Sequence, residues 1–216
     1  MKRRTLDIMF SVGGLVLAGL LLAAGIVLTS NANFAKSYVS DQLSQQKIMF
    51  KSADTLTDEE RQAACLVQYA GQQLTTGKQA ECYANKFIGL HLQSVANGKT
   101  YAELGDPQTQ LRTQVQQAQQ TNDPALPSLQ QQLTTITTQR DTLFRGETLR
   151  GLLLTTYGFS VFGEKAALAA LVAYIAGGVL ALLAIAGFIH AFRTPSTRAF
   201  APVESGADRV STPAGM

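Results

Sequence analysis

Two long uncharged runs divide the chain and predict helices that cross a membrane. Ala166–Phe192 has 27 residues without a charged side chain, and Ile8–Thr29 has 22. A helix of 27 residues is about 40 Å long, whereas the hydrocarbon core of a bilayer is roughly 30 Å thick. A chain of 216 residues has too small a core to bury such helices on every side. We therefore expect membrane-spanning helices at residues 8–30 and 166–192.

The first run has an alternative interpretation as a cleaved signal peptide. The tripeptide Ser30-Asn31-Ala32 loosely resembles a cleavage site. The apolar part of a signal peptide is typically about 7–15 residues long, which is shorter than this run. We expect the run to be retained as an anchor.

Short helices are expected between the two runs. The first span should continue outward as an amphipathic helix, because apolar residues follow it at near-helical spacing: Phe34, Tyr38 and Leu43. Thr57 and Glu60 form a capping box, which predicts a helix over residues 58–70. A further helix is expected over residues 79–96, ended by Asn97-Gly98.

Residues 104–145 are rich in Gln and Thr, yet their apolar residues follow a heptad-like pattern. In the second half they recur at intervals of 3, 4, 3 and 7: Leu126, Leu129, Leu133, Ile136 and Leu143. The first half has a matching set: Leu104, Leu111, Val115 and Ala118. The segment Thr121–Pro127 contains two prolines and separates the halves. The pattern predicts an antiparallel helical hairpin, projecting about 20–30 Å.

The chain returns to the second run through Gly146–Lys165, which is dense in apolar and aromatic residues. Aromatic residues just outside a span are typical of the lipid headgroup region. We expect an interfacial element or a groove for a partner helix, formed by Leu152, Leu153, Tyr157, Phe159 and Phe162. Ordinary core packing of the exported domain is the alternative.

Small residues recur every four positions in the second run, at Ala169, Ala173, Gly177 and Ala181. The first run offers a similar pair, Gly14 and Ala18. Small residues on one face let another helix approach closely. Either the two spans pack on each other, or one face stays free for a larger membrane complex.

The net charge of +3 lies at the two ends of the chain. Residues 30–165 carry 12 Lys/Arg and 12 Asp/Glu, whereas the ends carry six basic and three acidic residues. Lys2–Arg4 and Arg193 flank the two runs on their outer sides, and the positive-inside rule then places both termini in the cytoplasm. The chain lacks the basic patch of a nucleic-acid-binding domain.

These patterns predict an all-α fold in which two transmembrane helices flank an extracytoplasmic helical domain that contains the hairpin 104–145. The expected parts are a cytoplasmic N-terminus (1–7), a first span (8–30), the extracytoplasmic domain (31–165), a second span (166–192) and a disordered cytoplasmic tail (193–216).

Cys65 and Cys82 both fall in the segment expected outside the cell, where such a pair most often forms a disulfide. Their separation of 17 residues closes a loop worth roughly 3 kcal/mol of chain entropy. The chain has no C-x-x-C motif, so a redox role is not expected. His91 and His190 have no sequence neighbours that suggest a metal site, and we expect no catalytic residue, metal or cofactor.

Two stretches of the sequence resemble a known family. They are KQAECYANKFIGLHL followed by ANGKTYAELG, and RDTLFRGETLRGLLLTTYGFSVFGEKAALAALV. Both are similar to small actinobacterial membrane proteins with two spans and an exported helical domain. Relatives are often labelled aromatic ring-opening dioxygenases of the LigA type. Ring cleavage needs a metal held by His and carboxylate ligands, and the exported segment has one histidine, so the resemblance implies the topology rather than this activity.

We expect a non-catalytic integral membrane protein, an accessory or scaffold subunit of a larger cell-envelope or respiratory membrane complex. It would contact lipids, and a membrane-protein partner through the second span or the exported hairpin. The alternative is an exported lipid- or ligand-binding sensor, with a groove between Leu152–Phe162 and Gln79–Ala96. An enzyme is a third hypothesis and would need a carboxylate pair such as Glu81 with Glu103.

Overall fold

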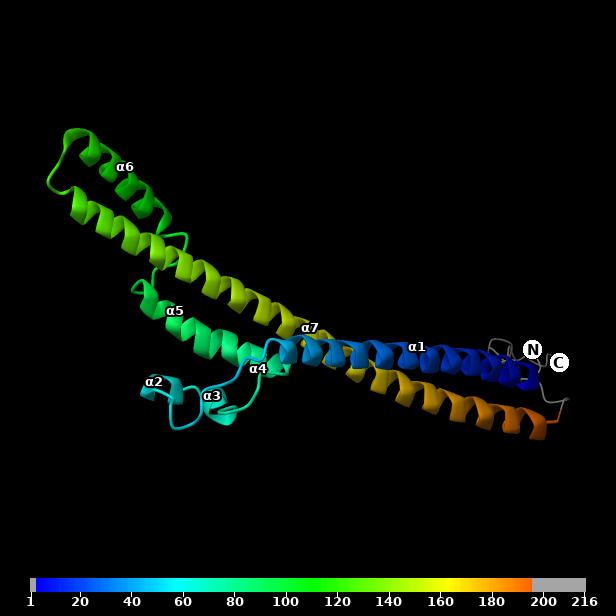
Figure 1. Cartoon of the computed structure of the whole chain (residues 1–216). Coiled ribbons are helices and arrows are strands. Elements are labelled where there is room, and N and C mark those ends of the chain that lie inside the picture. The colour runs from blue at the N-terminus through cyan, green and yellow to red at the C-terminus, as the bar shows by residue number, and fades with distance from the viewer. Residues whose placement is uncertain (1–2, 196–216) are drawn as a thin grey trace, which may run out of the picture. The chain divides into compact units, whose positions relative to one another are not determined.

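The computed structural model describes residues 3–195, and this part of the chain is all-α, as predicted. Its helices are α1 (Arg3–Gln45), α2 (Asp58–Arg61), α3 (Ala64–Gln68), α4 (Gly77–Cys82), the π-helix η1 (Tyr83–Ile88), α5 (Gly89–Val95), α6 (Gly105–Thr121) and α7 (Leu126–Arg193) (Figure 1). The described residues contain no strand, only an isolated antiparallel bridge between Met49 and Gln73. The tail predicted to be disordered lies outside the described residues from residue 196 onward.

The chain divides into two units, and the two long helices contribute to both. Of the described residues, the first unit holds 3–29 and 168–195, and the second holds 30–167. α1 and α7 are each long and apolar enough to cross a membrane.

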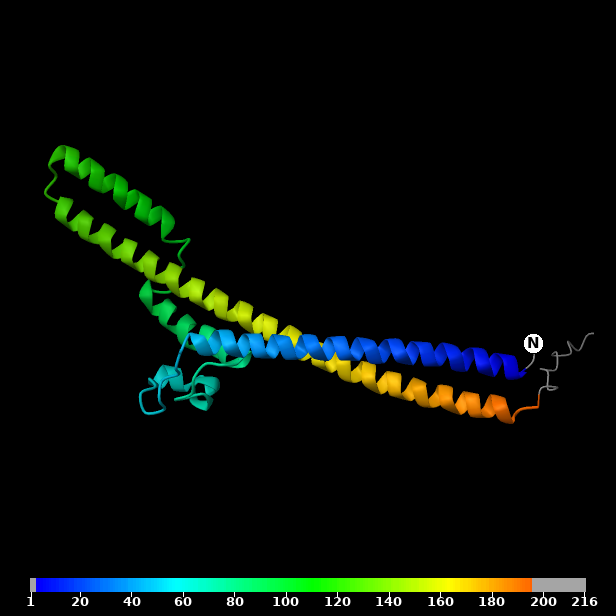
Figure 2. The same cartoon turned by 45° about the vertical axis from the view of Figure 1, so that its right-hand side comes forward.

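In the first unit, α1 and α7 run antiparallel and side by side (Figure 2). A Cβ on Gly14 would lie 3.6 Å from the Cβ of Ala184, and a Cβ on Gly177 would lie 3.2 Å from the carbonyl oxygen of Ala18. The Tyr174 hydroxyl lies 3.1 Å from the Thr29 hydroxyl. Large apolar side chains cover the outer surface of this pair, including Phe10, Leu20, Val172, Leu182 and Phe192.

The helix predicted over residues 58–70 is present as two short helices. The capping box forms, because the Glu60 amide donates to the Thr57 hydroxyl (3.2 Å) and the Thr57 amide donates to Glu60 Oε2 (2.8 Å). α2 then ends after one turn, and Ala63 adopts an extended backbone before α3 begins. After this break Leu66 is buried in the core.

The helix predicted over residues 79–96 begins earlier, at Gly77, and contains a π-helical segment in its middle. A second capping box forms at its start, between Thr76 and Gln79. α4, η1 and α5 follow one another without a gap. Asn97 and Gly98 then adopt positive φ values of 53° and 80°, which end the helix where the sequence predicted.

The hairpin pairs α6 with the first part of α7 (Figure 1). Asn122 caps α6 in the left-handed conformation, and the Asp123 carboxylate accepts a hydrogen bond from the Ala125 amide (2.8 Å). Val115, Ala118 and Ile136 of the predicted seam are buried.

α7 continues through Gly146–Lys165 as regular helix. Two of its glycines lie at close contacts with other helices of the second unit: Gly146 against Leu92, and Gly163 against Ala35. A Cβ on Gly163 would lie 2.8 Å from the Cβ of Ala35. The core beside these contacts is lined by Val39, Leu43, Phe50, Leu56, Leu66, Leu74, Ile88, Leu92, Leu143 and Leu153.

Candidate functional site

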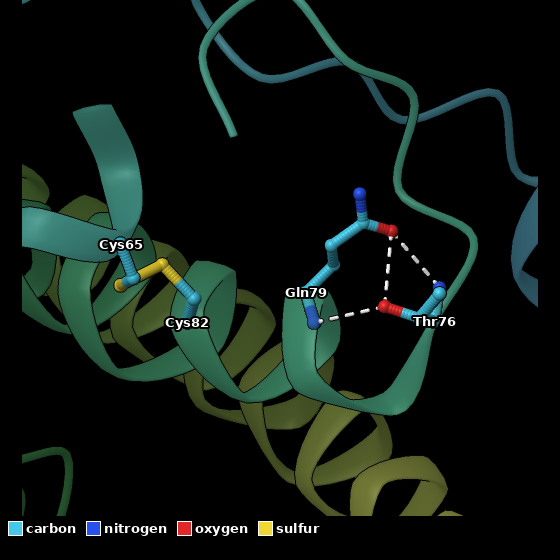
Figure 3. Close-up of a disulfide and its surroundings, with 4 residues drawn as sticks. All are labelled: Cys65, Thr76, Gln79 and Cys82. Atoms are coloured by element: carbon cyan, nitrogen blue, oxygen red, sulfur yellow. Dashed lines mark hydrogen bonds between the residues drawn. A yellow bond between two sulfur atoms is a disulfide. The ribbon is translucent and has the colours of Figure 1, made fainter. Parts of the chain in front are cut away.

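The two cysteines meet in the second unit. Cys65 on α3 and Cys82 at the end of α4 have sulfur atoms 2.03 Å apart, at disulfide-bonding distance (Figure 3). The bond joins the two short helices, and a loop of this length removes about 3 kcal/mol of chain entropy from the unfolded state. The disulfide therefore holds the ends of the segment between α3 and α4.

Gln79 fixes the loop inside that segment. Its Oε1 accepts hydrogen bonds from the backbone amides of Thr75 (2.8 Å) and Thr76 (3.0 Å), and its Nε2 donates to Gln72 Oε1 (3.2 Å). Figure 3 shows Gln79 bent back toward Thr76. Gln79 is 6% exposed, so these hydrogen bonds form with little competition from water. The loop is thus a well-defined surface.

This loop forms one wall of a cavity of about 780 Å³ within the second unit. The other walls are residues 32–40 of α1 and residues 160–167 of α7. Small buried residues let the three walls approach one another: Ala32, Gly77 and Gly163.

Three charged side chains line the cavity: Lys36, Lys78 and Glu164. All three are exposed to solvent, and none forms an ion pair with another described residue. The hydroxyl residues Ser40 and Thr76 also line it. The cavity therefore has a net positive charge, with donor groups around it.

Aromatic side chains lie on the surfaces of the same two helices. The ring centroids of Phe34 and Tyr38 are 5.7 Å apart, and those of Tyr38 and Phe159 are 5.8 Å apart. Within the predicted interfacial set, Leu152, Phe159 and Phe162 are exposed and Tyr157 is half-buried, with Phe162 at 76% exposure. Leu153, the fifth member, lies in the core instead, next to the helices that carry the disulfide.

The predicted small-residue face differs in its spacing from the contact that the structure forms. Ala173 and Gly177 lie in the contact between the two long helices, whereas Ala169 is exposed and Ala181 is half-buried. The buried small residues of α7 in the first unit are spaced by 3, 4, 7 and 7: Ala170, Ala173, Gly177, Ala184 and Ala191. Residues four apart are rotated by about 40° around the helix axis, but residues seven apart are rotated by only about 20°. A spacing of seven therefore keeps small residues on the contact face over a longer stretch. On α1, Gly14 and Ala18 both face α7.

Glu60, which the sequence indicated only as a capping residue, is also a buried carboxylate. Glu60 is 1% exposed, and its Oε1 accepts a hydrogen bond from Lys51 Nζ (2.8 Å) and lies 3.6 Å from His91 Nε2. Burial alone raises the pKa of Glu60, but the hydrogen bonds from Lys51 and Thr57 outweigh burial and hold this pKa below its ordinary value of 4.5. Glu60 is therefore ionised at neutral pH and joins three separate segments.

A second polar cluster lies on the hairpin. The Arg140 guanidinium sits 4.1 Å from the ring centroid of Tyr101 and donates to Gln108 Oε1, while Gln108 Nε2 donates to the Thr137 hydroxyl (2.8 Å). The Tyr101 and Phe144 rings are 5.8 Å apart and are 42% and 56% exposed. The apolar spacing of the hairpin gave no sign of this cluster, because its members lie on separate segments of the chain.

Within residues 3–195, no three His, Cys, Asp or Glu side chains gather closely enough to hold a metal ion. Glu103 accepts hydrogen bonds from the amide and the hydroxyl of Thr100, and these bonds lower its pKa. His190 Nε2 lies 3.9 Å from Asp7 Oδ2 in the first unit.

No protein-family model, curated protein or solved structure matches the chain. Its function is therefore inferred from its own residues and their geometry.

Proposed function

We propose that the chain is an integral protein of the plasma membrane with two spans, both termini in the cytoplasm and residues 31–165 outside. The apolar outer surface of the first unit supports this placement. The basic residues Lys2–Arg4 and Arg193 lie at the ends of the two spans that face the cytoplasm in this arrangement. A disulfide between Cys65 and Cys82 suits an oxidising exterior.

Within that placement, the protein acts as a non-catalytic accessory or scaffold subunit of a larger cell-envelope or respiratory membrane complex. The observation that carries this proposal is the patch at the hairpin formed by the exposed rings of Tyr101 and Phe144 with the half-buried Arg140. Aromatic residues and Arg are enriched where protein partners bind most strongly. Because Arg140 stacks on Tyr101, both side chains are already ordered and lose little entropy on binding.

A photoreactive residue at position 144, introduced in the native membrane, tests this role. We expect one discrete cross-linked partner at this position, and none at the exposed α6 residue Gln120, the matched control. The double variant Tyr101→Ala and Phe144→Ala should retain that partner about tenfold less in mild detergent, whereas Gln120→Ala should retain it fully. A monomer without an adduct at position 144 would contradict the proposal.

The second candidate function is an exported lipid- or ligand-binding module. The cavity of about 780 Å³ favours it, and this cavity shares only Ser160 and Gln79 with the groove expected between Leu152–Phe162 and Gln79–Ala96. Lipid extraction followed by mass spectrometry tests this second candidate. It predicts one stoichiometric lipid species after purification, and recovery of bulk lipid only would count against it.

A further inference from the structure

Two walls of the cavity lined by Lys36 and Lys78 directly adjoin the proposed spans in the sequence. Its α1 wall begins at Ala32, three residues after Thr29, and its α7 wall ends at Ala167, where the second apolar stretch begins. At 1.5 Å per residue, Ala32 lies about 5 Å beyond Thr29 along the helix. The headgroup layer outside the hydrocarbon core is roughly 5–7 Å thick. In the proposed membrane placement, the part of the cavity wall at Ala32 is therefore at headgroup depth.

The exposed aromatic residues support the same depth independently of the charges. Phe34 and Tyr38 lie on the stretch of α1 that lines the cavity, and Phe159 precedes the α7 wall by one residue. Aromatic side chains on helix surfaces are enriched at the interface between the membrane and water. Together these rings mark the boundary layer beside the cavity.

The charge of the cavity selects the kind of headgroup. Lys36 and Lys78 have no carboxylate partner among the described residues, so their ammonium groups are available to a phosphate. Thr76 and Ser40 add hydroxyl donors, and Glu164 can accept hydrogen bonds from headgroup hydroxyls. Two cations against one carboxylate favour a ligand with a net negative charge.

The size and rigidity of the cavity also suit a bound molecule. A volume of about 780 Å³ lies in the usual range for small-molecule sites. Gln79 and the disulfide hold the loop wall in place before any ligand arrives, which lowers the entropy lost on binding.

We propose that this cavity binds the headgroup of an anionic phospholipid of the outer leaflet, with Lys36 and Lys78 at the phosphate and Glu164 at the headgroup hydroxyls. The proposal rests on the proposed two-span placement and specifies the second candidate function. Phosphatidylglycerol has this chemistry and serves as the probe.

The test uses the full-length protein in nanodiscs that contain equimolar phosphatidylglycerol and phosphatidylethanolamine, followed by native mass spectrometry after transfer to detergent. We expect one phosphatidylglycerol to remain bound per chain in preference to phosphatidylethanolamine. The double variant Lys36→Gln and Lys78→Gln should bind it roughly 10- to 30-fold more weakly. The control variant Lys47→Gln and Lys86→Gln, which removes two exposed lysines outside the cavity, should bind it as the parent protein does.

Three results would overturn the proposal. They are equal retention of the two lipids, unchanged retention in the Lys36 and Lys78 variant, and equally strong binding of glycerol 3-phosphate or inorganic phosphate without a lipid. Circular dichroism of each variant reports whether it has folded, and both lysines are exposed, so folding should survive. A protein that stays in solution without detergent would instead disprove the membrane placement itself.

Discussion

Glu60 combines a local role with a long-range one. As the third residue of α2 it completes the capping box with Thr57, and as a buried carboxylate it holds Lys51 and lies near His91. The sequence predicted the first role because both partners lie within four residues. The second depends on three segments that only the folded chain brings together, so no local pattern indicates it.

Glu60→Gln should destabilise the second unit by about 1–3 kcal/mol at neutral pH, because a buried hydrogen bond to a charged group is weakened. Thermal unfolding of the full chain in detergent measures the change, followed by near-ultraviolet circular dichroism of Tyr69 and Tyr83, whose rings contact Phe50. The control is Glu59→Gln, on the exposed face of the same helix. Equal stability of the two variants would show that the buried carboxylate contributes nothing.

The same residue predicts a dependence on pH. The pKa of Glu60 is lower in the folded chain than its ordinary value of 4.5. Its contribution is therefore complete above that value and is lost as the pH falls through the folded pKa. Asp54 and Glu103, whose pKa values are also lowered by local hydrogen bonds, remain in both proteins. In the same unfolding assay, lowering the pH should reduce the stability of the parent protein more than that of the Glu60→Gln variant. An identical dependence of stability on pH in the two proteins would contradict this prediction.

At the scale of elements, glycines in α7 divide into those that face another helix and those that do not. Gly163 lies against Ala35, whereas a Cβ on Gly158 would have no atom within 4 Å. The sequence alone does not distinguish the two positions, because the difference comes from α1, which packs against Gly163 only.

Gly163→Ala and Gly158→Ala should therefore have opposite effects. The new methyl group at position 163 meets the Cβ of Ala35, which cannot rotate away, so we expect a loss of about 1–3 kcal/mol. At position 158 the better helix propensity of Ala should stabilise by up to about 1 kcal/mol. Denaturant unfolding of the two full-length variants gives both values, and a stabilising Gly163→Ala would show that the two helices do not pack there.

Element boundaries show the same division between local and distant causes. The capping signal at Thr57, the ending at Gly98 and the turn before Leu126 were predicted from their own residues. The break at Ala63 was not, because Ala favours helix and nothing in the local sequence requires an extended backbone there. Likewise, the interval of four between small residues indicated a helix contact but not its heptad spacing, which depends on how the two helices twist around each other.

For the whole molecule, long uncharged runs and the hairpin seam predicted the helical architecture well, because both are repeated over many residues. The candidate cavity was harder to predict. Lys36, Lys78 and Glu164 lie in three segments whose meeting depends on the packing of Gly163 and Gly77. The sequence indicated this region only through its aromatic residues, and the groove that it predicted at Leu152–Phe162 begins earlier in α7 than the cavity wall.

The central claim is that residues 31–165 lie outside the cell and both termini inside, and labelling of cysteines in intact cells with a membrane-impermeant maleimide tests it most directly. Cys65 and Cys82 should react only after an impermeant reductant opens their bond, and a cysteine placed at Ser128 on the hairpin should react at once. A cysteine at Ser211 should react only after lysis. Immediate labelling of Cys65 or Cys82 without reductant, or labelling at position 211 in intact cells, would contradict this account.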